Sequence, residues 1–142
     1  MSEGMSLEGV VEEHGFLSWL GVELESQSEG RVVMRVPYDE DLLNPTLDEG
    51  KGSVHGGVAA TLIDTACGFS LRGTFDDPGK ANLTTTDLDV KYLRPATGDL
   101  VATAEVVRAG GSVGVSRATV ESEYEGDTVE VAVGSATYRL FR

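Results

Sequence analysis

Hydrophobic residues follow two different repeats along the chain, first a helical one and then a two-residue one. Residues 7–17 carry apolar side chains at the i, i+3, i+4 and i+7 positions of an amphipathic helix, which Gly15 weakens. A second, more strongly apolar helix is expected at residues 56–72, with Gly73 at its end. After it, four segments alternate between hydrophobic and polar positions and are rich in Val, Thr and Tyr, which predicts β-strands. These segments are residues 84–93, 100–109, 113–124 and 128–141.

Turn-forming residues separate these elements. Glu29 and Gly30 lie between two short segments, residues 22–28 and 31–37, and predict a hairpin. Residues 38–53 are expected to form a loop, and a loop of this length in a small domain is more often functional than idle. The last four strands are joined by short links, which predicts that they form an antiparallel meander.

The order of these elements predicts one α+β domain over residues 1–142, with an N-terminal helical segment at residues 1–20. At 142 residues, the chain is long enough to bury a hydrophobic core. The helix at residues 56–72 is bulky over most of its circumference and must be covered broadly. A curved antiparallel sheet wrapped around this long central helix would provide that cover.

One acidic residue, Asp64, is expected in the middle of the apolar helix on a side without bulky side chains. At 100° per residue, it shares its face with small residues, and bulky residues lie roughly opposite. The small residues are Gly57, Ala60, Thr61 and Gly68, and the opposite group is Val58, Leu62, Ala66 and Phe69. No basic residue precedes Arg72 in this helix to pair with the carboxylate. Because an unpaired carboxylate is costly to bury, we interpret Asp64 as a candidate general base beside a ligand site.

The start of the same helix offers a second candidate group. The backbone N–H groups of Gly56 and Gly57 have no Cβ beside them and can bind an oxyanion, but a flexible hinge explains the two glycines equally well. His55 either holds the loop and caps the helix or acts as a base, and on a helical wheel it lies opposite Asp64. His14 is interpreted as an incidental helix residue.

Charge and cysteine content exclude several classes of partner. The net charge of −13, from 24 acidic and 11 basic residues, opposes binding to nucleic acid and to anionic membranes. Scattered acids and few lysines favour adaptation to a high-salt cytosol over an ordinary acidic protein. Cys67 is expected to be a buried structural thiol, and one Cys with two His makes a metal site unexpected. No secretory signal pattern or apolar run of ~18 residues is present, which predicts a cytoplasmic protein without a transmembrane helix.

Two motifs and their order carry a family resemblance. The first is residues 55–64 (HGGVAATLID), which ends at the helix aspartate, and the second is residues 85–96 (TTDLDVKYLRPA), followed by a Gly-Asp pair at 98–99. Together they resemble the hotdog-fold thioesterases, specifically the phenylacetate-pathway (PaaI-like) acyl-CoA thioesterase branch. The resemblance covers residues 16–140 and implies a hotdog fold, in which an antiparallel sheet wraps a long central helix.

The resemblance also implies roles for single residues. Asp64 corresponds to the catalytic carboxylate, which acts either as general base on water or as nucleophile toward the thioester carbonyl. Gly57 corresponds to the residue whose backbone N–H polarises that carbonyl, and Thr85 to a Ser or Thr of the partner subunit that holds water or Asp64. The family often has Asn or Gln just before the His-Gly-Gly run. Asn44 is assigned to that role, although Glu49 has the nearest matching offset.

The implied substrate is an acyl-CoA thioester, and no cofactor is expected apart from the coenzyme A of the substrate. Contacts to CoA are assigned to Gly56, Arg94, Arg108, Gly110 and Gly111, and the acyl pocket to Leu42, Leu43 and Phe69. Solvated strand ends explain the arginines and the glycine turn equally well. Two subunits are expected to pair edge to edge in a homodimer with active sites at the interface, or in a tetramer made of two such dimers.

Thr85 brings the resemblance into conflict with the strand pattern. Strict alternation places Thr85 on the face opposite Leu88, Val90 and Tyr92. A β-bulge in this strand would remove the conflict, and the sequence alone does not decide whether one is present.

Two other functions stay open. A hotdog-fold enoyl-CoA hydratase or dehydratase is suggested by residues 41–46, which are similar to that branch's Asp-Asn-Pro-His loop but lack the histidine. A non-catalytic acyl-CoA binding protein would bind the ligand without hydrolysing it, since a fold does not guarantee an activity. An absorbance assay on crotonyl-CoA identifies the hydratase, and ligand binding that survives Asp64→Asn identifies the binding protein.

Overall fold

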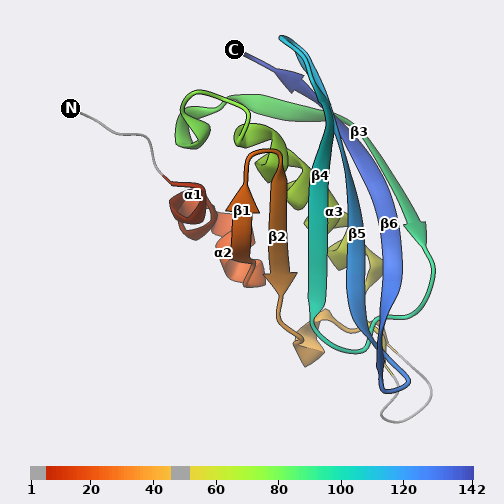
Figure 1. The fold of residues 1–142 in the computed structure, drawn as a ribbon. Coiled ribbons are helices and arrows are strands. Elements are labelled where there is room, and N and C mark those ends of the chain that lie inside the picture. Colours follow the sequence, from red (N-terminus) through yellow and green to blue (C-terminus); the bar gives the residue numbers. More distant parts are fainter. Residues whose placement is uncertain (1–5, 46–51) are drawn as a thin grey trace.

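The computed structural model describes residues 6–45 and 52–142, so part of the loop expected at residues 38–53 lies outside the described residues. A six-stranded antiparallel sheet curves around one long helix, and two short helices lie beside the first strand (Figure 1). The helices are α1 (Leu7–Glu13), α2 (Gly15–Leu20) and α3 (Gly56–Arg72), with 3₁₀ turns η1 (Glu40–Leu42) and η2 (Pro78–Lys80). The strands are β1 (Glu23–Ser28), β2 (Arg31–Val36), β3 (Leu83–Tyr92), β4 (Leu100–Ala109), β5 (Val113–Tyr124) and β6 (Asp127–Leu140).

The order of strands in the sheet is β1-β2-β4-β5-β6-β3. The predicted meander is therefore correct for β4, β5 and β6 but wrong for β3, which pairs with β6 at the edge of the sheet. The link at residues 93–99 crosses the ends of β6 and β5 to reach β4 (Figure 1). Three strand spacings amount to about 14 Å, and seven extended residues reach about 23 Å, so a link of this length also suits a crossover.

The long helix α3 begins and ends where the sequence predicts. His55 caps its N-terminus, and Gly73 follows its last residue. Leu62, Ile63 and Ala66 are fully buried, because the apolar face of α3 packs against the concave side of the sheet. Leu71 lies two turns after Asp64 on the same side of α3, and its side chain is fully buried against β5. This side of the helix is therefore less open than predicted.

The predicted helix at residues 7–17 is divided in two. The backbone of His14 is extended, so this residue ends α1 and caps α2, and its Nδ1 accepts a hydrogen bond from the N–H of Leu17 at 3.3 Å. His14 is therefore a capping residue and not the incidental helix residue that the sequence suggested. Gly15, which weakened the helical pattern, is the first residue of α2.

A buried pair of hydroxyl groups joins α3 to the sheet, and it provides a test of the packing. The Oγ atoms of Ser70 and Ser116 lie 2.7 Å apart, and both residues are almost fully buried. Ser70→Ala leaves the hydroxyl of Ser116 without this partner, and we expect the free energy of unfolding in urea to fall by about 1–3 kcal/mol. The double variant with Ser116→Ala should lose less than the sum of the two single changes. Ser18→Ala, at an exposed site, is the control, and an additive double variant would contradict the pairing.

Candidate active site

Asp64 lies half-buried in the middle of α3, where it lines a cleft of about 320 Å³. The walls of this cleft, which we call the Asp64 cleft, come from α1, α2, α3, β3 and β6. The apolar wall includes Val10 and Leu17 of the N-terminal helices and Phe69 of α3. Phe69, which was expected in the acyl pocket, lines the same cleft as the carboxylate.

Two hydroxyl groups hold one oxygen of the Asp64 carboxylate. The Oγ1 of Thr85 donates to Oδ1 of Asp64 at 2.7 Å, and the phenolic oxygen of Tyr138 lies 2.7 Å from the same Oδ1. The Tyr138 oxygen is also 2.6 Å from the backbone oxygen of Asp64, which helps to fix the ring. Among the described residues, no donor reaches the other carboxylate oxygen, Oδ2, so this atom remains available to a water molecule or a substrate.

A β-bulge brings Thr85 to this position. The register between β3 and β6 shifts between Thr85 and Asp87, so Thr85 and the residues after Asp87 do not follow one strict alternation. The bulge resolves the conflict in the strand pattern, and it lets Thr85 reach the helix of its own chain. The contact with Asp64 forms within one subunit, which corrects the expectation that a partner subunit supplies Thr85.

Tyr138 is a site residue that the sequence pattern did not reveal. It lies opposite Thr85 in the sheet, and its hydroxyl reaches α3 over Gly68, where an added Cβ would lie 2.6 Å from the phenolic oxygen. Burial, together with the hydrogen bond to Asp64, raises the pKa of the Tyr138 phenol far above its usual value, so the group stays protonated and donates. The available signal was Gly68, a small residue one turn after Asp64, which marks a close approach of another side chain.

The N-terminus of α3 has a different arrangement from the one predicted. The structure confirms that His55 caps the helix, because its Nδ1 accepts from the N–H of Gly57 at 2.8 Å. The N–H expected to be free for an oxyanion is therefore engaged by a side chain in this state. The carbonyl of Gly56 accepts a hydrogen bond from the hydroxyl of Tyr92 at 2.6 Å, which ties the helix start to β3.

A second hollow of about 290 Å³ continues along α3 toward its N-terminus. It is lined by Leu42 and Leu43, which were expected in the acyl pocket, and by Gly57. Phe16 and Thr61 line both this hollow and the Asp64 cleft, so the two adjoin each other. Phe16 stacks on Trp19 with ring centroids 6.4 Å apart, although Trp19 is 77% exposed. The expected acyl-pocket residues are thus distributed along one side of α3.

Asn44 and Arg94 line a third hollow, of about 380 Å³, together with His55 and Gly56. Arg94 is exposed, and its Nη1 donates to the backbone oxygen of Glu130 at 2.7 Å. Neither Asn44 nor Arg94 lines the Asp64 cleft within one chain. Both residues lie near the N-terminal end of α3, and their roles as an active-site amide and a CoA contact stay predictions.

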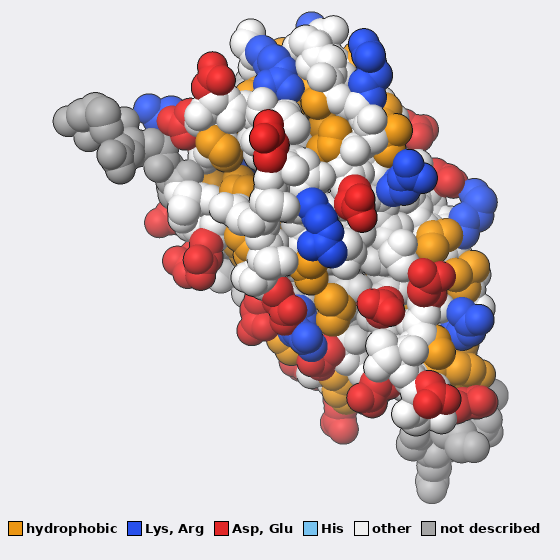
Figure 2. Space-filling view, viewed as in Figure 1, with side chains coloured by type: hydrophobic (Ala, Val, Ile, Leu, Met, Phe, Trp, Pro, Cys, Tyr) orange, Lys and Arg blue, Asp and Glu red, His pale blue; other side chains and the backbone are white. Residues whose placement is uncertain are grey.

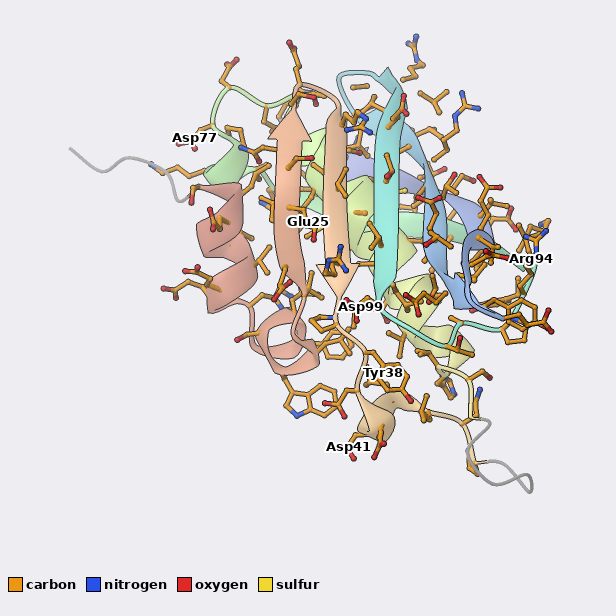
Figure 3. The ribbon with its side chains drawn as sticks, turned by 60° about the horizontal axis from the view of Figure 1, so that its bottom comes forward. Glu25, Tyr38, Asp41, Asp77, Arg94 and Asp99 are labelled. Atoms are coloured by element: carbon orange, nitrogen blue, oxygen red, sulfur yellow. The ribbon has the colours of Figure 1, made fainter. Side chains whose placement is uncertain are left out.

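The other expected CoA contacts lie at the opposite end of the long helix. Gly110 accepts a hydrogen bond from Arg142, which also bonds to Thr74 just beyond α3. Because α3 has 17 residues and is about 25 Å long, the turn of Gly110 and Gly111 is far from Arg94. Figure 3 likewise shows Arg94 on the opposite side of the molecule from Asp77, which lies in the segment after α3. One chain does not bring these residues together, and their assignment to CoA binding stays a prediction for the expected subunit interface.

Cys67 is fully buried beside the site residues of α3. Burial, with the charge of Asp64, raises the pKa of the Cys67 thiol to about 12, so it stays protonated at neutral pH. This is the structural thiol that the sequence predicted. Within the described residues, no group of three potential ligands suitable for a metal ion is present.

The outer face of the sheet carries acidic and basic side chains that are intermixed (Figure 2). Arg35 bridges Glu25 and Asp99 there, with Nη1 of Arg35 at 2.8 Å from Oδ2 of Asp99. Exposed ion pairs of this kind contribute little stability. In the hollow around them, no carboxylate is held by two hydroxyl groups in the way that Asp64 is.

Of the helices that the structure describes, none is long and apolar enough to cross a membrane.

The family model of the thioesterase superfamily matches residues 51–129, more than half of the chain. The chain belongs to the thioesterase superfamily. This thioesterase is 48% identical to a putative esterase of Halobacterium salinarum, and the match covers 96% of this chain and 91% of that protein. The medium/long-chain acyl-CoA thioesterase YigI of Salmonella typhimurium is 35% identical over 61% of this chain and 62% of that protein.

A solved structure agrees with the fold of this thioesterase. A thioesterase family protein from Silicibacter pomeroyi superimposes with a TM-score of 0.78 and 27% sequence identity, over 90% of each chain. These similarities confirm the hotdog fold, the expected family and the enzyme class, a thioester hydrolase. The assignment to the PaaI-like branch stays a prediction.

Proposed function

We propose that this thioesterase hydrolyses acyl-CoA thioesters to a free acid and CoA, with Asp64 as the catalytic carboxylate. The observation that carries the proposal is the carboxylate itself: Thr85 and Tyr138 hold Oδ1, while Oδ2 has no partner among the described residues and the side chain lines a cleft. The similarity to YigI, which is named an acyl-CoA thioesterase, supports the substrate class.

In the proposed mechanism, Oδ2 of Asp64 removes a proton from a water molecule in the Asp64 cleft. The resulting hydroxide attacks the thioester carbonyl carbon and forms a tetrahedral oxyanion. The C–S bond then breaks, and the proton leaves with the thiolate as free CoA thiol. The hydroxyls of Thr85 and Tyr138 keep the carboxylate in one orientation, so the side chain of Asp64 loses less conformational entropy on reaching the transition state. As an alternative role, a carboxylate oxygen of Asp64 attacks the carbonyl carbon itself. The C–S bond breaks, the CoA thiolate leaves and takes a proton from solvent, and water then hydrolyses the resulting anhydride.

The N–H of Gly57 of the partner subunit, across the dimer interface proposed below, is the proposed oxyanion donor for a substrate at Asp64, because Gly57 and Asp64 of one chain are seven residues, about 10 Å, apart along α3. The substrate carbonyl would replace Nδ1 of His55, which accepts from this N–H in the structure. The positive end of the helix dipole adds to the stabilisation of the oxyanion. In this proposal, His55 caps the helix in the free enzyme, and the substrate carbonyl displaces it from the N–H of Gly57.

A homodimer paired along β3, or a tetramer of two such dimers, is the proposed assembly. Strand β3 lies at the edge of the sheet, where an unpaired strand can receive a second copy. Leu88, Tyr92 and Leu93 are exposed on and just after this strand, and Tyr92 is 56% exposed. Pairing here would cover apolar surface close to the start of α3.

Release of CoA from a panel of aryl and aliphatic acyl-CoA thioesters, followed with a thiol reagent, tests the proposed function. The buried, protonated Cys67 should add little background to this assay. We expect hydrolysis of at least one class of acyl-CoA, and higher activity and melting temperature in molar KCl than in low salt, because salt screens the repulsion of a −13 chain. No thiol release from any member in either salt would overturn the proposal, and hydration of crotonyl-CoA would favour the hydratase.

A further inference from the structure

Arg72, the last residue of α3, lines the Asp64 cleft at the end away from Gly57. It is half-buried, and its guanidinium lies 5.7 Å from the centroid of the Phe69 ring. Eight residues separate it from Asp64, which corresponds to about 12 Å along the helix axis. A positive charge therefore stands at one end of a cleft whose lining is partly apolar and partly polar, with the carboxylate farther along it.

The hydrogen bonds of Arg72 leave most of its donors unused. Its Nη1 donates to the backbone oxygens of Pro78 and Ala81, at 3.2 and 3.0 Å, and this clamps turn η2 to the end of the helix. An arginine has five N–H donors, so this clamp leaves those on Nη2 and Nε. Within residues 6–45 and 52–142, neither of these atoms has a hydrogen-bond partner in the protein.

The charge of Arg72 is also uncompensated. The chain has 24 acidic residues against 11 basic ones, yet among the described residues no carboxylate oxygen lies within 4.0 Å of this guanidinium. Burial lowers the pKa of Arg72 below its usual value, which reflects the loss of water around the charge. A clamp on two backbone oxygens does not require a charge, so a ligand with a negative charge is the partner that the site lacks.

Resting on the proposed function, we infer that Arg72 forms an anion subsite in the Asp64 cleft, which selects acyl groups that end in a carboxylate. With the thioester at Asp64, the group that reaches Arg72 belongs to the acyl chain. The pantetheine arm between the sulfur and the first phosphate is longer than the interval between the two residues. Against the negative charge of the whole chain, an anionic acyl group needs such a local positive charge.

Paired substrates test this subsite. The ratio of kcat/KM for adipoyl-CoA to that for hexanoyl-CoA, and for glutaryl-CoA to valeryl-CoA, is expected to exceed about ten in the wild type. Arg72→Gln should lower these ratios by about tenfold or more, and Arg72→Lys should retain part of them. A ratio does not depend on the fraction of folded enzyme, so a merely structural role of Arg72 would leave it unchanged. Arg117→Gln makes the same change of charge at an exposed site outside the cleft and is the matched control.

Two further measurements separate the possible outcomes. The same acyl groups as N-acetylcysteamine thioesters lack the phosphates of CoA, and the preference for the carboxylate should persist with them. If Arg72→Gln instead weakens all CoA thioesters equally and no N-acetylcysteamine thioester, then Arg72 binds a phosphate and the inference is wrong. An equal ratio in wild type and Arg72→Gln also overturns it.

A binding experiment keeps the inference apart from the proposed function. The thioethers S-(4-carboxybutyl)-CoA and S-pentyl-CoA cannot be hydrolysed, and calorimetry gives the Kd of each. We expect the carboxylate form to bind at least about tenfold more tightly to the wild type, and this advantage to disappear in Arg72→Gln. If no acyl-CoA is hydrolysed, the proposed function fails, and the thioether pair still decides whether the subsite exists.

Discussion

Asparagine in place of Asp64 is expected to lower kcat for thioester hydrolysis at least about 100-fold, since general base catalysis contributes this much or more. The amide keeps an oxygen that accepts from Thr85 and Tyr138 but cannot take a proton from water. KM should change much less, because the cleft keeps its shape. Steady-state kinetics on the best substrate of the acyl-CoA panel measure both constants, and Asp64→Ala should lose at least as much activity.

Asp76→Asn removes the same charge from an exposed site after α3 and is the control for long-range electrostatics. Activity of Asp64→Asn within a few fold of the wild type would rule out the carboxylate as base or nucleophile. A single turnover in water labelled with ¹⁸O identifies the nucleophile role when water attacks the Asp64 carbonyl of the anhydride. The label enters the side chain of Asp64 only if this residue attacks the carbonyl.

Removal of the Tyr138 hydroxyl is the second change with a large expected effect. Tyr138→Phe deletes one of the two hydrogen bonds on Oδ1 of Asp64, and we expect kcat to fall by about tenfold. A structural role alone would lower the melting temperature and leave kcat of the folded enzyme unchanged.

Gly68→Ala disrupts the same contact between Tyr138 and Asp64, but from the side of α3. The new Cβ would lie 2.6 Å from the Tyr138 oxygen, so the ring must move away from Asp64, and the kinetic result should match that of Tyr138→Phe. Gly15→Ala is a helical control with nothing within 4 Å of the added Cβ. If Gly68→Ala keeps full activity while Tyr138→Phe loses it, the geometry proposed for the pair is incorrect.

Local patterns were sufficient to predict most of the elements. Helix α3 begins at Gly56 and ends at Arg72 as expected, because a glycine pair, a long apolar run and a final glycine mark it within the sequence. The strands agree to within a residue or so at their ends, since alternation is a property of each segment by itself. The division between α1 and α2 was missed because the spacing of apolar residues continues through His14, although the backbone does not.

Relations between distant segments were not predictable in this way. The pairing of β3 with β6 depends on which neighbour completes the sheet, and a short link at residues 93–99 suits a hairpin and a crossover alike. The helix pattern identified Asp64 as a candidate, but Gly68 beside it signals only that some side chain approaches and not that this side chain is Tyr138, 74 residues later in the chain. The bulge after Thr85 has no mark in the alternation of residue types, so its contact with Asp64 came only from the family resemblance and the structure.

The three groups that meet at Oδ1 of Asp64 come from α3, from β3 and from β6, the final strand of the sheet. Because Tyr138 is 74 residues after Asp64 in the sequence, this constellation cannot be complete before both α3 and β6 have been made. A ribosome that has produced the helix and the first strands holds a chain whose carboxylate has neither hydroxyl in place. Maturation of the site thus waits for the carboxyl-terminal segment, and a chain released before Tyr138 is made would hold the acid without the tyrosine that orients it.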